Sequence, residues 1–195
     1  MIYIVTGHPR SGTSMMMAAL QAGGMTLAYS ARREARLEDH MMPQASGFNP
    51  GGIWELERSQ LLEPSFPAVH EGKAIKLVWD WLKFLKPYEP GYQVISMMRH
   101  PEEVHQSFSA TVNVDRVQIR HTYMDRLNQV NNMLAERDDV DDLMVVDYVG
   151  CLDNPNATFE HIASAGWPIN WEAAAEIPDR SLYRFRVGET ITEGA

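Results

Sequence analysis

The stretch from Ile2 to Gly24 constrains the fold of this chain more than any other. It opens with four apolar, aromatic or β-branched residues, continues through a turn bounded by Gly7 and Gly12, and then runs through good helix formers to a pair of glycines. Apolar β-branched runs favour strands, and glycine after a run of helix formers is a typical helix end. The stretch therefore predicts a strand, a tight loop and a helix.

The turn has the glycine spacing of a phosphate-binding loop. Gly7 and Gly12 stand five positions apart and precede Thr13 and Ser14, which matches G-x-x-x-x-G-K-[ST] except that threonine replaces the lysine. In Walker NTPases that lysine reaches the β- and γ-phosphates, and the next hydroxyl binds Mg²⁺. The cation of this chain is Arg10, inside the loop. We expect an anion-binding loop at a helix N-terminus with an altered triphosphate-cleaving apparatus.

The rest of the chain alternates between strand and helix patterns. Further strands are predicted at Ala74–Trp79, Gln93–Met98 and Leu143–Val146, and helices at Trp54–Leu62, after His100, at Asp115–Arg137 and at Thr158–Ala165. This order predicts one α/β domain over residues 1–195, a P-loop-type parallel sheet flanked by helices on both faces. Ligands bind such sheets at the carboxyl ends of the strands, so the loop and Arg99 should share one edge.

Composition excludes several classes of function and site. The content of 45% hydrophobic and 22% charged residues is ordinary for a globular domain, and no apolar run approaches the ~20 residues of a membrane span. A net charge of −9 argues against a nucleic-acid partner. The histidines lack metal-binding spacings, so no metal is expected. A single cysteine and no basic leader favour a cytoplasmic location. The oligomeric state stays open.

Several segments resemble the PAPS-dependent sulfotransferases. Pro9–Ser14, PRSGTS, is similar to the 5′-phosphosulfate-binding loop of the family branch with PRSGT[ST]. In Arg99–Ser107, RHPEEVHQS, a serine follows an arginine after eight positions, as in the family's 3′-phosphate-binding segment. Asn49–Glu55 and Val146–Pro155 also resemble family segments. The resemblance implies that PAPS is the sulfonate donor and PAP the product.

The resemblance also implies roles for individual residues. Arg10 matches the family's catalytic lysine or arginine, and it would donate a charge-assisted hydrogen bond to the phosphate oxygen that leaves the sulfonate. An ion pair of Arg99 with Glu102 or Glu103 at the helix start is the alternative to phosphate binding. The cofactor-binding positions would be Pro9, Arg10, Ser11, Gly12, Thr13 and Ser14 at the 5′ side, and Arg99 and Ser107 at the 3′-phosphate.

Sulfonate transfer needs a base that removes the proton of the acceptor. Glu55 is the first candidate because many relatives with this loop use a glutamate. His8 and Glu34 compete with it, and an unperturbed histidine pKa near ~6.5 suits a base. We expect transfer to a hydroxyl or amine of a small-molecule acceptor, with acceptor specificity in Met25–Gly72. Two alternatives stay open: a nucleotide kinase with a degenerate Walker loop, and a non-catalytic protein that binds PAP or another nucleotide.

Overall fold

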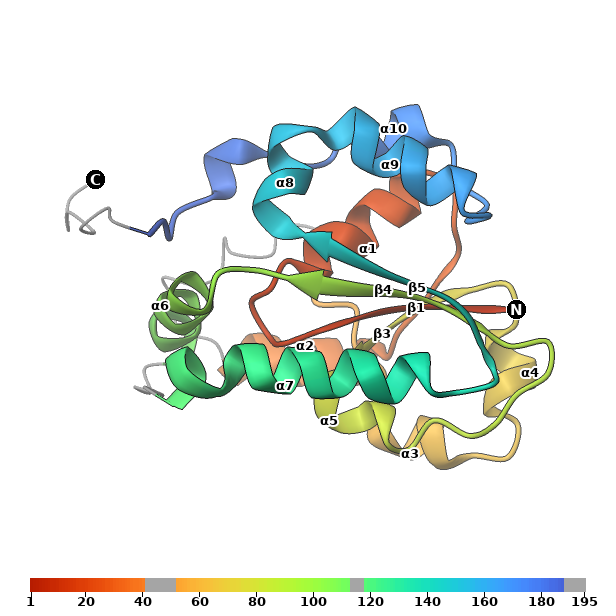
Figure 1. Cartoon of the computed structure of the whole chain (residues 1–195). Helices are drawn as coiled ribbons and strands as arrows, with labels where there is room; N and C mark the ends of the chain where they lie inside the picture. The colour runs from red at the N-terminus through yellow and green to blue at the C-terminus, as the bar shows by residue number, and fades with distance from the viewer. Residues whose placement is uncertain (41–51, 113–117, 188–195) are drawn as a thin grey trace.

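The computed structural model describes residues 1–40, 52–112 and 118–187, which contain a five-stranded parallel sheet (Figure 1). The strand order is β2-β3-β1-β4-β5, so β1 lies in the centre. The segment from Gly7, where β1 ends, to Ser14 is called the phosphate loop below. The strands are β1 Ile2–Gly7, β2 Leu27–Ala28, β3 Ala74–Val78, β4 Tyr92–Met98 and β5 Val140–Asp147. The predicted α/β class with a parallel sheet is confirmed.

The central strand is buried along its whole length. Every residue of β1 is buried, and the strand pairs in parallel with β3 on one side and with β4 on the other. Val5 is the partner of Lys76 in β3 and of Ile95 in β4. A strand that is covered on both faces carries apolar side chains on both, which explains the unbroken apolar run at the start of the sequence.

Helices cover both faces of the sheet, as predicted. In Figure 1, α1 and α8 to α10 lie on one face, whereas α3, α5 and α7 lie on the other. Each layer packs on its own apolar cluster. No helix within the described ranges is long and apolar enough to cross a membrane. The helices are α1 Thr13–Ala22, α2 Ala31–His40, α3 Arg58–Leu62, α4 Phe66–His70, α5 Trp79–Leu82, α6 Pro101–Val112, α7 Gln118–Ala135, α8 Tyr148–Asp153, α9 Pro155–Ser164, α10 Trp171–Ala175 and the 3₁₀ helix Arg180–Leu182.

The carboxyl edge of the sheet brings the predicted anion-binding segments together. β1 ends at Gly7, whose partner in β4 is Met97, and β4 ends one residue later at Met98. The phosphate loop and Arg99 therefore share one edge, as the sequence predicts. One local prediction is wrong: the helix expected from Trp54 begins at Arg58, because its N-cap Glu57 is extended and Glu55 forms a bridge to β3.

Candidate active site

The phosphate loop between β1 and α1 depends on two left-handed residues. Arg10 has φ 78° and Gly12 has φ 97°, a region that a residue with a Cβ enters only at a cost. The ring of Tyr148, at the start of α8, lies where a Cβ of Gly12 would stand. The backbone N–H of Ser11 donates to the carbonyl of His8 at 3.0 Å, which closes the turn. Gly12 is therefore required by both its backbone angle and its packing.

The groups of the loop fit a phosphate or sulfonate ligand. The Ser11 hydroxyl is buried and has no hydrogen-bond partner among the residues that the structure describes. Thr13 and Ser14 open α1, whose N-terminal N–H groups and positive dipole end favour an anion. Two buried cations, Arg99 and Lys76, flank the loop. An oxyanion in the loop would accept a hydrogen bond from the Ser11 hydroxyl and be attracted by both cations.

Arg10 is oriented by Ser107, which the family resemblance assigned to the 3′-phosphate. The Nε of Arg10 donates to Ser107 Oγ at 3.0 Å, although the two residues are 97 positions apart in the chain. Burial, with the positive charges of Arg99 and Arg184, lowers the pKa of Arg10 to about 10. The guanidinium thus stays protonated at neutral pH and can stabilise negative charge.

Arg99 connects the loop, α6 and the C-terminal segment. Its Nε donates to Glu103 Oε2 at 2.9 Å, one Nη donates to the carbonyl of Arg10 at 3.3 Å, and the other donates to the carbonyl of Phe185 at 3.0 Å. Its guanidinium also lies over the rings of Tyr148 and Tyr183. The alternative ion pair, with Glu103, is present in the structure. Binding of a 3′-phosphate by Arg99 remains a prediction.

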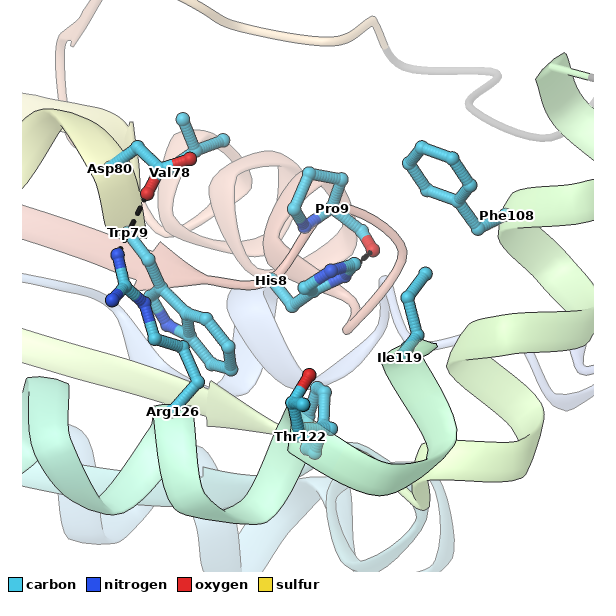
Figure 2. Close-up of a pocket in the computed structure, with 10 residues that line it drawn as sticks. His8, Pro9, Val78, Trp79, Asp80, Phe108, Ile119, Thr122 and Arg126 are labelled. Carbon is cyan, nitrogen blue, oxygen red and sulfur yellow. Dashed lines mark hydrogen bonds and ion pairs between the residues drawn. The ribbon is translucent and has the colours of Figure 1, made fainter. Parts of the chain in front are cut away.

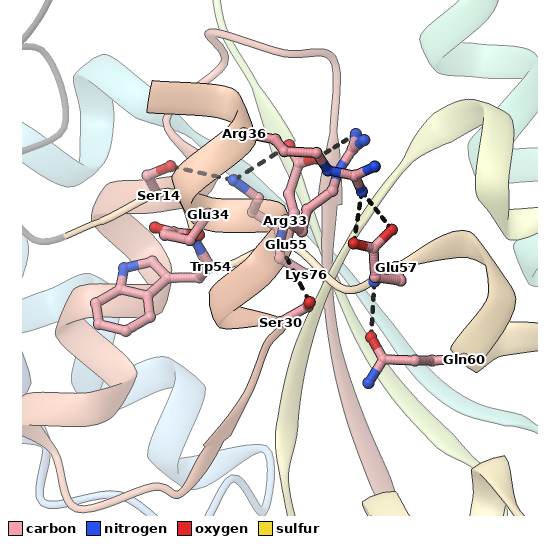
Figure 3. A network of polar contacts seen from close by, with 10 residues as sticks. All are labelled: Ser14, Ser30, Arg33, Glu34, Arg36, Trp54, Glu55, Glu57, Gln60 and Lys76. Atoms are coloured by element: carbon pink, nitrogen blue, oxygen red, sulfur yellow. Dashed lines mark hydrogen bonds and ion pairs between the residues drawn. The ribbon is translucent and has the colours of Figure 1, made fainter. Parts of the chain in front are cut away.

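Lys76 is a site residue that the sequence patterns did not single out. Its Nζ, near the carboxyl end of β3, lies 3.2 Å from Ser14 Oγ and 3.7 Å from Glu55 Oε1 (Figure 3). Burial lowers the pKa of Lys76 to about 8; Glu55 and Glu34 act against this change, and Arg10 adds to it. The signal that could have found it is a lysine inside the otherwise apolar run Ala74–Trp79.

The two glutamates considered as bases are both engaged. Glu55 Oε2 accepts from Arg33 Nη2 at 3.0 Å, while Oε1 faces Lys76 (Figure 3). The carboxylate of Glu34 accepts from the backbone N–H groups of Ile53 and Trp54. Glu34 thus holds Trp54 in its left-handed conformation, with φ 62°, and fixes where the following residue points. Lys76 stands between Glu55 and Ser14 of the loop.

His8 borders a cavity of about 450 Å³ (Figure 2). Its Nδ1 lies 2.7 Å from the carbonyl of Pro9, which can only accept, so in the neutral ring Nε2 carries the lone pair. Aromatic rings of Trp79, Phe108 and Tyr123 surround the imidazole. The lining residues are His8, Pro9, Val78, Trp79, Asp80, Phe108, Ile119, Thr122, Tyr123 and Arg126.

This cavity does not lie where the sequence placed acceptor specificity. None of its lining residues comes from the segment Met25–Gly72, of which residues 41–51 lie outside the described part of the chain. The cavity is built from the loop, the end of β3 and helices α5, α6 and α7. Across the described ranges, no group of three or more His, Cys, Asp or Glu is placed to hold a metal ion.

Comparison with known proteins shows the fold. No protein-family model and no curated protein matches the chain. The sulfotransferase domain from the curacin biosynthetic pathway superposes with a TM-score of 0.51 at 12% identity, over 98% of this chain and 93% of that domain. The sulfotransferase domain of the Synechococcus PCC 7002 olefin synthase gives a TM-score of 0.45 at 14% identity, over 94% of this chain and 75% of that domain. An unliganded sugar kinase from Janibacter sp. HTCC2649 gives 0.46 at 15% identity, over 88% of this chain and 96% of that one. The superposition on the curacin domain, with a TM-score above 0.5, shows that the chain has a sulfotransferase-like α/β fold.

Proposed function

We propose that the protein binds PAPS at the carboxyl edge of the sheet and transfers its sulfonate to a hydroxyl or amine of a small acceptor. The observation that carries this proposal is the position of Arg10, which lies inside the loop, is held by Ser107 and is flanked by two further buried cations. A cation at that point can stabilise the bridging oxygen of a departing phosphate. In a Walker loop the corresponding cation would follow Gly12, where this chain has Thr13.

The nucleotide would span the loop and the start of α6. Loop N–H groups and the hydroxyls of Ser11, Thr13 and Ser14 would hold the 5′-phosphate. Arg99 and Ser107 would bind the 3′-phosphate. A guanidinium has five N–H donors, and within the described residues three of those on Arg99 have a partner. Arg99 can therefore keep its present contacts and still offer two donors to a phosphate.

The reaction itself needs one electrostatic stabiliser and one base. The acceptor oxygen or nitrogen forms a bond to sulfur while the bond from sulfur to the phosphate oxygen breaks, and that oxygen takes the electron pair. Arg10 would stabilise the charge that develops there, and the acceptor proton would pass to the base. The contacts favour His8 over Glu55 as the base, because His8 borders the cavity whereas Glu55 already binds two cations.

Calorimetry with PAP and 5′-AMP tests this function. A dedicated 3′-phosphate site should bind PAP more tightly than 5′-AMP. A charge-assisted hydrogen bond contributes roughly 1.5–3 kcal/mol, so Arg99→Ala should weaken PAP binding by about 10- to 150-fold and barely change 5′-AMP binding. Arg36→Ala removes an exposed arginine that pairs with Glu57 and serves as the control. Equal affinity of the wild type for both ligands would overturn the proposal.

The same samples separate the two alternatives. A kinase should prefer ATP with Mg²⁺ over PAP, and EDTA should abolish its turnover. A non-catalytic nucleotide sensor should bind PAP without converting PAPS to PAP in the presence of any hydroxyl or amine acceptor. Sulfonate transfer requires PAP release from PAPS that depends on acceptor and persists in EDTA.

A further inference from the structure

We propose that Glu55 is a positioning residue that keeps Lys76 protonated and turned toward the phosphate loop. Lys76 is a buried amine on the central part of the sheet, whose Nζ contacts Ser14 on one side and Glu55 on the other. Glu55 in turn is held by Arg33 of α2. Figure 3 shows these side chains converging from β3, α1, α2 and the segment before α3. The carboxylate therefore has a structural partner at each oxygen.

The protonation state of Lys76 decides what the Ser14 hydroxyl can do. A charged Nζ can only donate, so Ser14 Oγ accepts from it and directs its own hydrogen elsewhere. At the N-terminus of α1 that hydrogen can be donated to an anion in the loop. A neutral amine can accept instead, which would turn the hydroxyl away from the loop. Loss of the proton thus removes a positive charge and misdirects a donor at once.

Glu55 opposes the effect of burial on this amine. The charged groups that face Lys76 are Glu55, Glu34 and Arg10, and Arg33 acts on it through Glu55. Burial and Arg10 favour the neutral amine, whereas the two carboxylates favour the charged one. Glu55 lies within contact distance of Nζ, while Glu34 is occupied by backbone N–H groups. Removing the Glu55 charge should therefore neutralise Lys76 near neutral pH.

Titration of Lys76 by NMR tests the pairing without any nucleotide. Lysine labelled with ¹³C at Cε reports the titration of each of the few lysines of the chain, and Lys76→Met assigns the signal of interest. An opposite charge within about 4–6 Å typically changes a pKa by about 1–3, so Glu55→Gln should lower the pKa of Lys76 by about that amount. Arg33→Gln removes a competing cation and should raise it. Glu57→Gln changes an arginine-paired glutamate of the same segment and should leave it unchanged.

PAP binding gives the second readout, and this step rests on the proposed function. Glu55→Gln should weaken PAP binding about tenfold at pH 8 and far less at pH 6, where Lys76 regains its proton; tenfold is the effect of about 1.4 kcal/mol. In a protein that already carries Lys76→Met, Glu55→Gln should not weaken PAP binding further. An unmoved Lys76 pKa in Glu55→Gln, or lost turnover with PAP affinity intact at every pH, would overturn the proposal. A lowered Lys76 pKa in a protein that does not bind PAP would sustain the pairing and remove the proposed sulfotransferase function.

Discussion

Two buried cations flank the phosphate loop, and they differ in how their charge is maintained. Arg99 pairs with Glu103, four residues further along the chain in α6. Lys76 pairs with Glu55, which reaches it from a separate segment that α2 holds in place. A guanidinium keeps its proton at any working pH, whereas burial lowers the pKa of the Lys76 amine to about 8. The Arg99 side of the loop is therefore electrostatically fixed, and the Lys76 side is adjustable.

The largest effect should come from removing the counter-ion of the fixed side. Arg99 cannot neutralise itself, so Glu103→Gln leaves a buried charge uncompensated, and breaking such a pair costs roughly 3–5 kcal/mol. Both side chains are almost fully buried, which removes solvent screening. We expect the loss in unfolding free energy, measured in urea, to be the same at pH 6 and pH 9. A loss that fades at high pH would erase the difference between the two sides.

Arg10 belongs to the loop that the two cations flank, and its removal should affect turnover more than binding. Arg10→Ala should lower the rate of PAPS-dependent transfer by ~10²–10³, as for other removed transition-state donors. PAP affinity should change much less, because neighbouring cations and loop N–H groups remain. Steady-state rates with an acceptor that the wild type sulfonates measure turnover, and calorimetry on the same preparation measures PAP affinity. An unchanged rate would show that one of the flanking cations stabilises the departing oxygen instead.

Removing the counter-ion of the adjustable side should give a smaller and pH-dependent loss of stability. Glu55→Gln lowers the pKa of Lys76 further, and a pKa lowered by one costs about 1.4 kcal/mol of stability while the amine is protonated. Above the wild-type pKa of about 8 the amine is neutral with or without Glu55. The destabilisation should therefore be full near pH 6, shrink as the pH rises toward 8, and be small above that pH. Equal losses at pH 6 and pH 9 would show that Lys76 does not titrate in this range.

The smallest effect should come from Tyr183, which joins the C-terminal segment to the fixed side. Its hydroxyl donates to Glu103, and burial together with that carboxylate raises the pKa of Tyr183 to about 12. Tyr183→Phe should cost about 1 kcal/mol, the usual net value of one hydrogen bond. The exposed Tyr29 supplies a matched control, since Tyr29→Phe should leave unfolding unchanged. A loss as large as that of Glu103→Gln would mean that the hydroxyl is needed to keep the Glu103 carboxylate on Arg99.

The difference between the two sides also explains what the sequence could predict. The loop, the parallel sheet and the shared edge of the loop and Arg99 follow from glycine spacing and apolar runs; the direct contact between Arg10 and Ser107 was not predicted. The pairing of Arg99 with Glu103 could be foreseen, because Glu103 lies in the first turn of a helix that begins two residues after Arg99. The position of Glu55 could not be predicted in this way, because it depends on Glu34, which binds the backbone of Trp54 and fixes a left-handed turn.

Lys76 and the cavity beside His8 show two further limits of sequence patterns. The run Ala74–Trp79 predicts an apolar strand, although Lys76 stands in its middle. A lysine that is buried almost completely needs a partner, and such residues gather at functional sites. The cavity was not predicted for a different reason: its lining combines short pieces of the loop, β3, α5, α6 and α7, and no contiguous segment carries its pattern. Chemistry that depends on side chains from distant segments is the part that sequence patterns leave out.

The C-terminal segment has a consequence for how the protein is made. Arg99 donates to the carbonyl of Phe185, and Glu103 accepts from Tyr183 and from the N–H of Val187. During synthesis the loop, the sheet and α6 leave the ribosome long before these residues do, and N-terminal parts fold first. A nascent chain that stops before Tyr183 would lack the contacts of Arg99 with Phe185 and of Glu103 with Tyr183 and Val187. The candidate active site would thus be completed last, when the final described residues dock.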